Sequence, residues 1–309
     1  MTNQQRPALG LLVGVLAAVL ALPFPVQADT TWVRMATPRF ELYTNLSEHA
    51  GRQTLAWFEQ AHQAVTSELP AAQRSARPVR VYLFASEEDF EPYRASEVSL
   101  GYALRGRHRS YVAIQFSGPA TRRIIVHEYV HLVLQSMKFR MPHWLEEGTA
   151  EFYSTLGVFD SRLYAGLPAA DHVMTLTRLP MLDPETFRAV DGQIPYHVER
   201  FRTGVFYSQS WGLVHMLTMR PGYREKFPAF TAMLRRGTAP EQAFEAAFGR
   251  TLGEAFRDLA AYVNEGRIQA MQLRVAPIRW LRISPAQRLS DEEMAVVLEE
   301  LVSELDSAR

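Results

Sequence analysis

The chain has 309 residues, with 33 basic and 33 acidic side chains and no cysteine. The balanced charge argues against a nucleic-acid-binding surface. The lack of cysteine excludes both a disulfide framework and a lipidated cysteine anchor. A chain of this length can bury a large hydrophobic core.

The first 28 residues have the features of an export signal. Arg6 gives a positive start, and the apolar run Ala8–Leu22 that follows is short for a membrane span. Val26-Gln27-Ala28 offers small residues at the cleavage positions. We therefore expect residues 1–28 to be a signal peptide and the mature chain to start near Asp29, in a bacterial periplasm or outside the cell. An uncleaved membrane anchor is the alternative.

The residues after this segment predict an α+β arrangement. Alternating or β-branched apolar residues indicate strands at Arg39–Thr44, Val79–Phe84 and Tyr111–Phe116. Helical periodicity and capping residues indicate helices at Ser47–Leu69 and from Ser86 to Tyr93. Gly101 to Ser110 is rich in arginine and punctuated by glycine, so we expect a loop there.

The second half is expected to be mainly helical. Gly, Pro and Asp interrupt Leu156 to Pro195, which predicts a long, partly helical connector. Helices are then expected at Gly204–Thr218, Tyr223–Arg235, Pro240–Phe248 and Leu252–Arg267, and from a Ser290 cap to about Leu305. The sequence thus predicts an α+β lobe with zinc-binding helices over 29–155 and an α-helical lobe over 156–275. Residues 276–309 would form a tail and an amphipathic helix, and a zinc cleft would lie between the two lobes.

The stretch from Arg122 to Leu134 contains the pattern His127-Glu128-x-x-His131 in an apolar run without Gly or Pro. Residues four apart share one face of a helix, so both imidazoles can reach one metal ion. Glu128 is rotated away from that line and can act as the base toward a metal-activated water. The alternative is a core helix that happens to carry two histidines, but burying these polar groups without a partner would be costly.

A second motif follows after Pro142, in which Glu147 and Glu151 are four residues apart on an expected helix. Zinc sites built from two histidines and one glutamate take the third ligand from a following helix, which indicates Glu147. Glu151 could then accept a hydrogen bond from the far nitrogen of a ligand histidine and fix its tautomer. The alternative is that Glu146, Glu147 and Glu151 form a solvated acidic face.

HExxH followed by Trp144-Leu145-x-Glu147-Gly148-x-Ala150 resembles the gluzincins of the peptidase MA clan, which include thermolysin-like and aminopeptidase-N-like enzymes. The resemblance implies that Glu147 is the third zinc ligand and that Glu151 matches the acidic residue kept four positions beyond it. The chain is also similar, over roughly residues 31 to 265, to bacterial peptidase-MA-like domains of unknown function. That similarity includes Trp32 and the Phe40–Thr44 opening.

Tyr207-x-x-x-Trp211 resembles the helix of aminopeptidase-N-like enzymes that opens with a tyrosine stabilising the transition state. The resemblance therefore implies this role for Tyr207. His197 is a second possible donor to a developing oxyanion. The Gly-x-Met-Glu-Asn sequence that binds a free substrate amine in aminopeptidases is absent before His127, and the spacer from His131 to Glu147 is shorter than in those enzymes. An endopeptidase is therefore favoured over an aminopeptidase.

In gluzincins the edge strand beside the zinc pairs with an extended substrate. The candidate here is the strand formed by Tyr111, Val112, Ala113, Ile114 and Gln115. Pairing through backbone hydrogen bonds does not depend on the side chains of the bound segment, which suits a peptide substrate. An ordinary sheet strand is the alternative.

These residues predict an exported zinc metallopeptidase with one Zn²⁺ per chain, acting on a peptide or protein. No nucleic-acid partner and no stable membrane insertion after signal cleavage are expected. The alternative is an inactive exported module that binds a peptide or a cell-envelope partner around a structural zinc. The presence of Glu128 favours the enzyme, because a structural site has no use for a base.

Export is expected to remove residues 1–28, because the apolar run ends at small residues suited to signal peptidase. Mass measurement of the protein from its native host should show a mature chain starting near Asp29. An intact Met1, or a start far from Asp29, would contradict this prediction.

Overall fold

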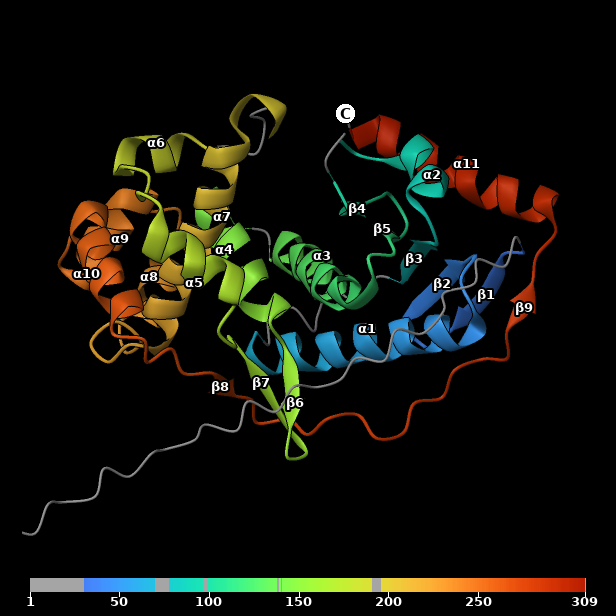
Figure 1. Ribbon diagram of the computed structural model, residues 1–309, viewed down its shortest axis with the longest axis horizontal. Helices are drawn as coiled ribbons and strands as arrows, with labels where there is room; N and C mark the ends of the chain where they lie inside the picture. Colours follow the sequence, from blue (N-terminus) through green and yellow to red (C-terminus); the bar gives the residue numbers. More distant parts are fainter. Residues whose placement is uncertain are drawn as a thin grey trace, which may run out of the picture.

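The computed structural model describes residues 31–69, 78–96, 99–137, 139, 141–190 and 196–308, with side chains from 202 onward in the last range. The expected signal peptide, residues 1–28, lies outside these residues, so export stays a prediction. Within the described ranges no helix combines the length and the apolar character needed to cross a bilayer. The fold is mixed α+β, as the sequence predicted (Figure 1).

A six-stranded mixed sheet forms the N-terminal half, in the order β4-β5-β3-β2-β1-β9. The strands β2, β3 and β5 run parallel, while β1, β4 and β9 are antiparallel to their neighbours. Their bounds are β1 Val33–Ala36, β2 Phe40–Thr44, β3 Val79–Phe84, β4 Gly101–Arg105, β5 Ser110–Gln115 and β9 Gln287–Arg288. Parallel strands need crossover connections, and helix α1 (Glu48–Glu68) provides the one from β2 to β3.

Helices cover both faces of this sheet. On one face α1 and α3 (Thr121–Ser136) pack on Leu42, Val81 and Val112. On the other face α2 (Glu87–Phe90) and the C-terminal helix α11 (Asp291–Ala308) pack on Tyr82 and Tyr111. Successive side chains of a strand point to opposite faces, which separates the two sets of core residues. The expected Ser290 cap is present: the Glu293 amide donates to Ser290 Oγ at 3.2 Å.

The chain continues from α3 through α4 (His143–Ser154) into a mainly helical half, at the left in Figure 1. A small sheet of β6 (Gly157–Phe159), β7 (Arg162–Ala165) and β8 (Met271–Gln272) lies beside it. The helices are α5 Ala170–Arg178, α6 Pro184–Ala189, α7 Tyr196–Met219, α8 Phe227–Arg235, α9 Pro240–Phe248 and α10 Leu252–Asn264. One buried cluster contains residues of both halves, for example Phe40 and Leu213.

The close approach of α4 to α7 depends on Gly148. A Cβ at this position would lie 2.3 Å from the Ser210 carbonyl oxygen and 2.6 Å from Val214 Cγ2. Real Cβ atoms do not approach backbone that closely, so only glycine lets the two helices touch here. The glycine of the Glu147-Gly148 pair therefore serves helix packing directly beside a candidate ligand.

Two expectations about the sheet were wrong. Gly101–Arg105 is a strand rather than part of a loop. Only Tyr102 of its five residues is buried, so the sequence lacks the apolar pattern by which a strand is recognised. Tyr111–Gln115 is not an edge strand, because β5 pairs with β3 on one side and with β4 on the other. The edge beside the HExxH helix is β4, where Arg105 Nη1 donates to the Gln135 carbonyl of α3 at 3.0 Å.

Candidate metal centre

The HExxH motif lies on α3, and its two histidines face each other across one helical turn. The Nε2 atoms of His127 and His131 are 3.0 Å apart, and the two ring centroids are 4.7 Å apart. Both side chains are partly buried, with 15% and 17% of their surface exposed. The spacing of four residues thus places two imidazole nitrogens next to each other on one face of the helix.

Helix α4 brings a carboxylate to the same point. Glu147 Oε2 lies 3.4 Å from His127 Nε2 and 3.6 Å from His131 Nε2. These donor atoms all lie within 4.8 Å of one another and could hold a metal ion. Around a tetrahedral zinc ion with bonds of about 2.05 Å, neighbouring donor atoms are separated by roughly 3.4 Å. The three observed separations fall around that value.

The Glu147 carboxylate itself indicates a missing partner. Glu147 is only 6% exposed, and no hydrogen bond to its Oε2 is found within the described residues. An unsatisfied buried polar atom costs about 1–3 kcal/mol, and more when it is charged. A cation bound between Glu147 and the two histidines would supply the interaction that Oε2 lacks. The residues present therefore fit a metal ion.

Glu151 lies one turn beyond Glu147, on the far side of His127. Its Oε1 is 3.2 Å from His127 Nδ1, the nitrogen that points away from the cluster. A carboxylate there favours the tautomer with hydrogen on Nδ1, which leaves the Nε2 lone pair free to face Glu147. This is the geometry expected of a residue that orients a metal ligand.

Further polar side chains hold Glu151 in place. Its Oε2 lies 3.0 Å from His172 Nε2 on α5 and 3.2 Å from Arg123 Nη2 on α3. His172 Nδ1 in turn lies 3.1 Å from Ser208 Oγ on α7. The sequence analysis missed these residues. The contact of Arg123 with this group could have been predicted, because Arg123 precedes His127 by four positions on the same helix face. His172 has no local sequence motif that indicates its role.

The titration behaviour of the cluster reflects strong coupling. Burial alone would lower the pKa of His127, but the Glu151 and Glu147 carboxylates outweigh it and raise that pKa. Burial alone would raise the pKa of Glu147 and of Glu151, but the neighbouring histidines hold both below the ordinary value. The two carboxylates therefore prefer the ionised form, which is the form that binds a metal. The raised pKa of His127 means that protons would compete with a metal for its nitrogen.

Glu128 lies beside the candidate ligands and against the sheet edge. Burial raises the pKa of Glu128 above its ordinary value. A Cβ on Gly101 of β4 would lie 3.4 Å from Glu128 Cγ and 2.8 Å from Ile124 Cγ2. The absence of a side chain at Gly101 therefore lets the edge strand pass directly over the candidate base.

The remaining predicted site residues lie on or near α7. The Tyr207 ring lies 6.4 Å from the His127 ring, between centroids, so the phenol is close to the cluster. His197 belongs to the first turn of α7, and its side chain lies outside the described part. His143 stacks on Phe206 at 5.3 Å.

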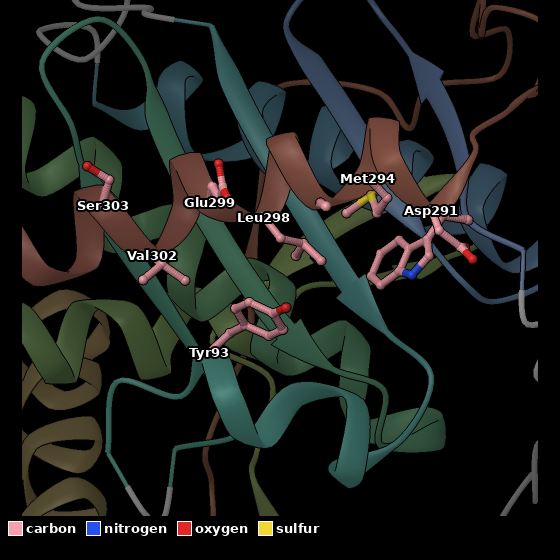
Figure 2. Close-up of a pocket in the computed structure, with 9 residues that line it drawn as sticks. Tyr93, Asp291, Met294, Leu298, Glu299, Val302 and Ser303 are labelled. Atoms are coloured by element: carbon pink, nitrogen blue, oxygen red, sulfur yellow. The ribbon is translucent and has the colours of Figure 1, made fainter.

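Figure 2 shows a groove lined by residues of α11. Its volume is about 540 Å³, and none of His127, His131 and Glu147 lines it. Trp32, Tyr93 and residues of α11, including Met294 and Leu298, line it. These residues belong to the face of the sheet opposite α3. The groove therefore contributes nothing to the candidate metal centre.

The ligand assignment predicts that Glu147→Gln lowers zinc affinity by about tenfold or more, because it removes the charged ligand. Glu146→Gln is the matched control, since its carboxylate is not part of the cluster. Chelator competition on the purified variants gives both affinities. Loss of zinc from the Glu146 variant with retention in the Glu147 variant would reassign the ligand.

Comparisons with models of known protein families and with curated proteins gave no match. What defines the candidate metal centre is its geometry. Three donor atoms from α3 and α4 converge, Glu128 follows His127 directly, and Glu151 contacts the Nδ1 atom of His127.

Proposed function

We propose that this protein is a zinc-dependent metallopeptidase of the gluzincin type, exported from a bacterial cell and cleaving within peptide chains. The observation that carries the proposal is the convergence of His127 Nε2, His131 Nε2 and a buried Glu147 Oε2 for which no hydrogen bond is found among the described residues, beside Glu128. Two imidazoles and one carboxylate, with room for a further non-protein ligand, are typical of catalytic zinc sites.

His127, His131 and Glu147 would hold the zinc. A bound Zn²⁺ supplies a Lewis acid that lowers the pKa of water and polarises a carbonyl. Glu151 keeps His127 in the tautomer that presents Nε2, and Arg123 and His172 keep Glu151 in place. Orientation of this kind commonly contributes 10- to 100-fold to metal affinity or activity.

Glu128 would accept the proton of the attacking water and deliver it to the leaving amine. It follows His127 directly, so its carboxylate points beside the ligand face rather than into it. Burial favours its neutral form, and a nearby cation favours its charged form, so the group is suited to both halves of a proton transfer.

An extended peptide would bind along β4. Among the described strands β4 pairs only with β5, so its outer edge is available for backbone pairing. Gly101 on this strand lies against Glu128. A peptide paired there would place a carbonyl group close to the base, which supports β4 in the role first assigned to β5.

Tyr207 would donate its hydroxyl hydrogen to the oxyanion that forms during attack. It approaches His127 from α7, with 6.4 Å between the centroids of the two rings. A donor that bonds more strongly to the oxyanion than to the carbonyl acts on turnover more than on binding.

Glu128→Gln should retain zinc and lose hydrolysis by roughly 10² to 10⁴ in rate, because it keeps the shape and removes the base. Metal analysis and single-turnover cleavage of a peptide library measure the two effects. Normal turnover would exclude the assigned mechanism. Retained zinc without any hydrolysis in the wild-type protein would favour the binding module instead.

Tyr207→Phe removes one oxygen and should lower kcat by roughly 10² to 10³ with little change in KM, the usual scale for one oxyanion donor. His197→Ala is the comparison variant. If Tyr207→Phe turns over normally while His197→Ala does not, the donor is misassigned.

A further inference from the structure

One segment of the chain concentrates positive charge although the whole chain is neutral. Residues 266–290 contain no Asp or Glu. The same stretch carries five arginines: Arg267, Arg274, Arg279, Arg282 and Arg288. All five are exposed, and none forms an ion pair with a described residue. We name residues 273–288 the basic strap.

The basic strap is held along the protein rather than loose. In Figure 1 it runs from β8 to β9 beside α1. The Ile278 amide donates to Gln60 Oε1 of α1 at 2.8 Å, and the Ser284 amide donates to the Ala36 carbonyl of β1 at 2.9 Å. Val275, Ile283 and Ala286 pack against the main core. The inward side chains are thus apolar, and the arginines are left to face outward.

The strap also exposes a tryptophan to an unusual degree. Trp280 is 94% exposed, between Arg279 and Arg282. Large aromatic side chains are normally well buried, so an almost fully exposed indole on a segment held by backbone hydrogen bonds indicates a binding surface.

A second exposed aromatic group extends from the adjoining hairpin. Strand β8, where the strap begins, pairs with β7, and the Leu273 amide donates to the Leu163 carbonyl at 2.8 Å. The β6–β7 hairpin turns at Asp160 and Ser161, and it carries Phe159, which is 53% exposed. The start of the strap is therefore joined to the hairpin through β7.

We propose that the basic strap and the β6–β7 hairpin adsorb the protein to a bilayer that carries anionic phospholipids. The arginines attract the lipid phosphates, and the Trp280 and Phe159 rings enter the headgroup region. This is adsorption to a surface without a membrane span, and it is independent of the metal centre.

A bilayer fits these observations better than an acidic protein segment. The exposed groups lie on an extended strap and a projecting hairpin, and neither lines the grooves formed by α11 or by α6 and α9. A flat partner needs only that basic and aromatic groups share a surface. Tryptophan is enriched where apolar chains meet polar headgroups, while arginine binds phosphate in a bidentate manner.

The test is co-sedimentation of the mature protein from its native host with lipid vesicles. One set contains phosphatidylcholine alone, and the other adds phosphatidylglycerol. Binding to the second set should exceed binding to the first and should fall as salt is added. Arg279→Gln/Arg282→Gln should reduce binding to anionic vesicles by roughly tenfold or more. Trp280→Ala should reduce it by about tenfold, since the indole buries a large apolar surface.

Arg236→Gln/Arg257→Gln is the matched control, because it removes the same charge from exposed positions on the helical half. Thermal unfolding should be unchanged in all variants, since the altered side chains are exposed. Absence of binding to anionic vesicles overturns the proposal, and so does an equal loss in the control. If Trp280→Ala binds anionic vesicles normally, the indole does not enter the headgroup region and its proposed role is wrong.

Discussion

The Glu147 carboxylate, buried between α3 and α4 against two imidazole nitrogens, is the interaction on which the candidate site depends. A buried carboxylate is stable only with partners, and those present are His127 and His131 at 3.4 and 3.6 Å. These partners converge only because α3 and α4 pack together, and α4 in turn packs closely on α7 through Gly148. The sheet below α3 fixes the first helix, and α7 fixes the second.

The same arrangement explains why the site is built from both halves of the chain. Helix α3 lies on the sheet, while Ser208 and Tyr207 come from α7 of the helical half. The chain Arg123–Glu151–His172–Ser208 crosses from one half to the other next to the metal cluster. A shift between the halves would therefore move Glu151, which contacts His127. The packing of the molecule is thus linked to the geometry of the candidate ligands.

Sequence patterns predicted the features that depend on spacing within a single helix or strand. The four-residue spacings of His127–His131 and Glu147–Glu151, the α+β class and most helices followed from periodicity and capping. The predictions failed where tertiary pairing decides the outcome. The composition of β4 is unfavourable for a strand, and β4 forms because it can pair with β5. Because β4 is the outermost strand, Tyr111–Gln115 is not at the edge of the sheet. His172 has no motif, since its role arises from a contact with Glu151 made across the fold.

The proposed zinc site is open to solvent, and the coordination of its metal tests this most directly. X-ray absorption at the zinc edge of the mature protein, together with metal analysis, reports the number and type of ligands. We expect one zinc per chain bound by two imidazoles, one carboxylate and a ligand from solvent, with Glu147→Gln altering the carboxylate contribution. A shell closed by a fourth protein side chain, or no stoichiometric zinc at all, would contradict the account.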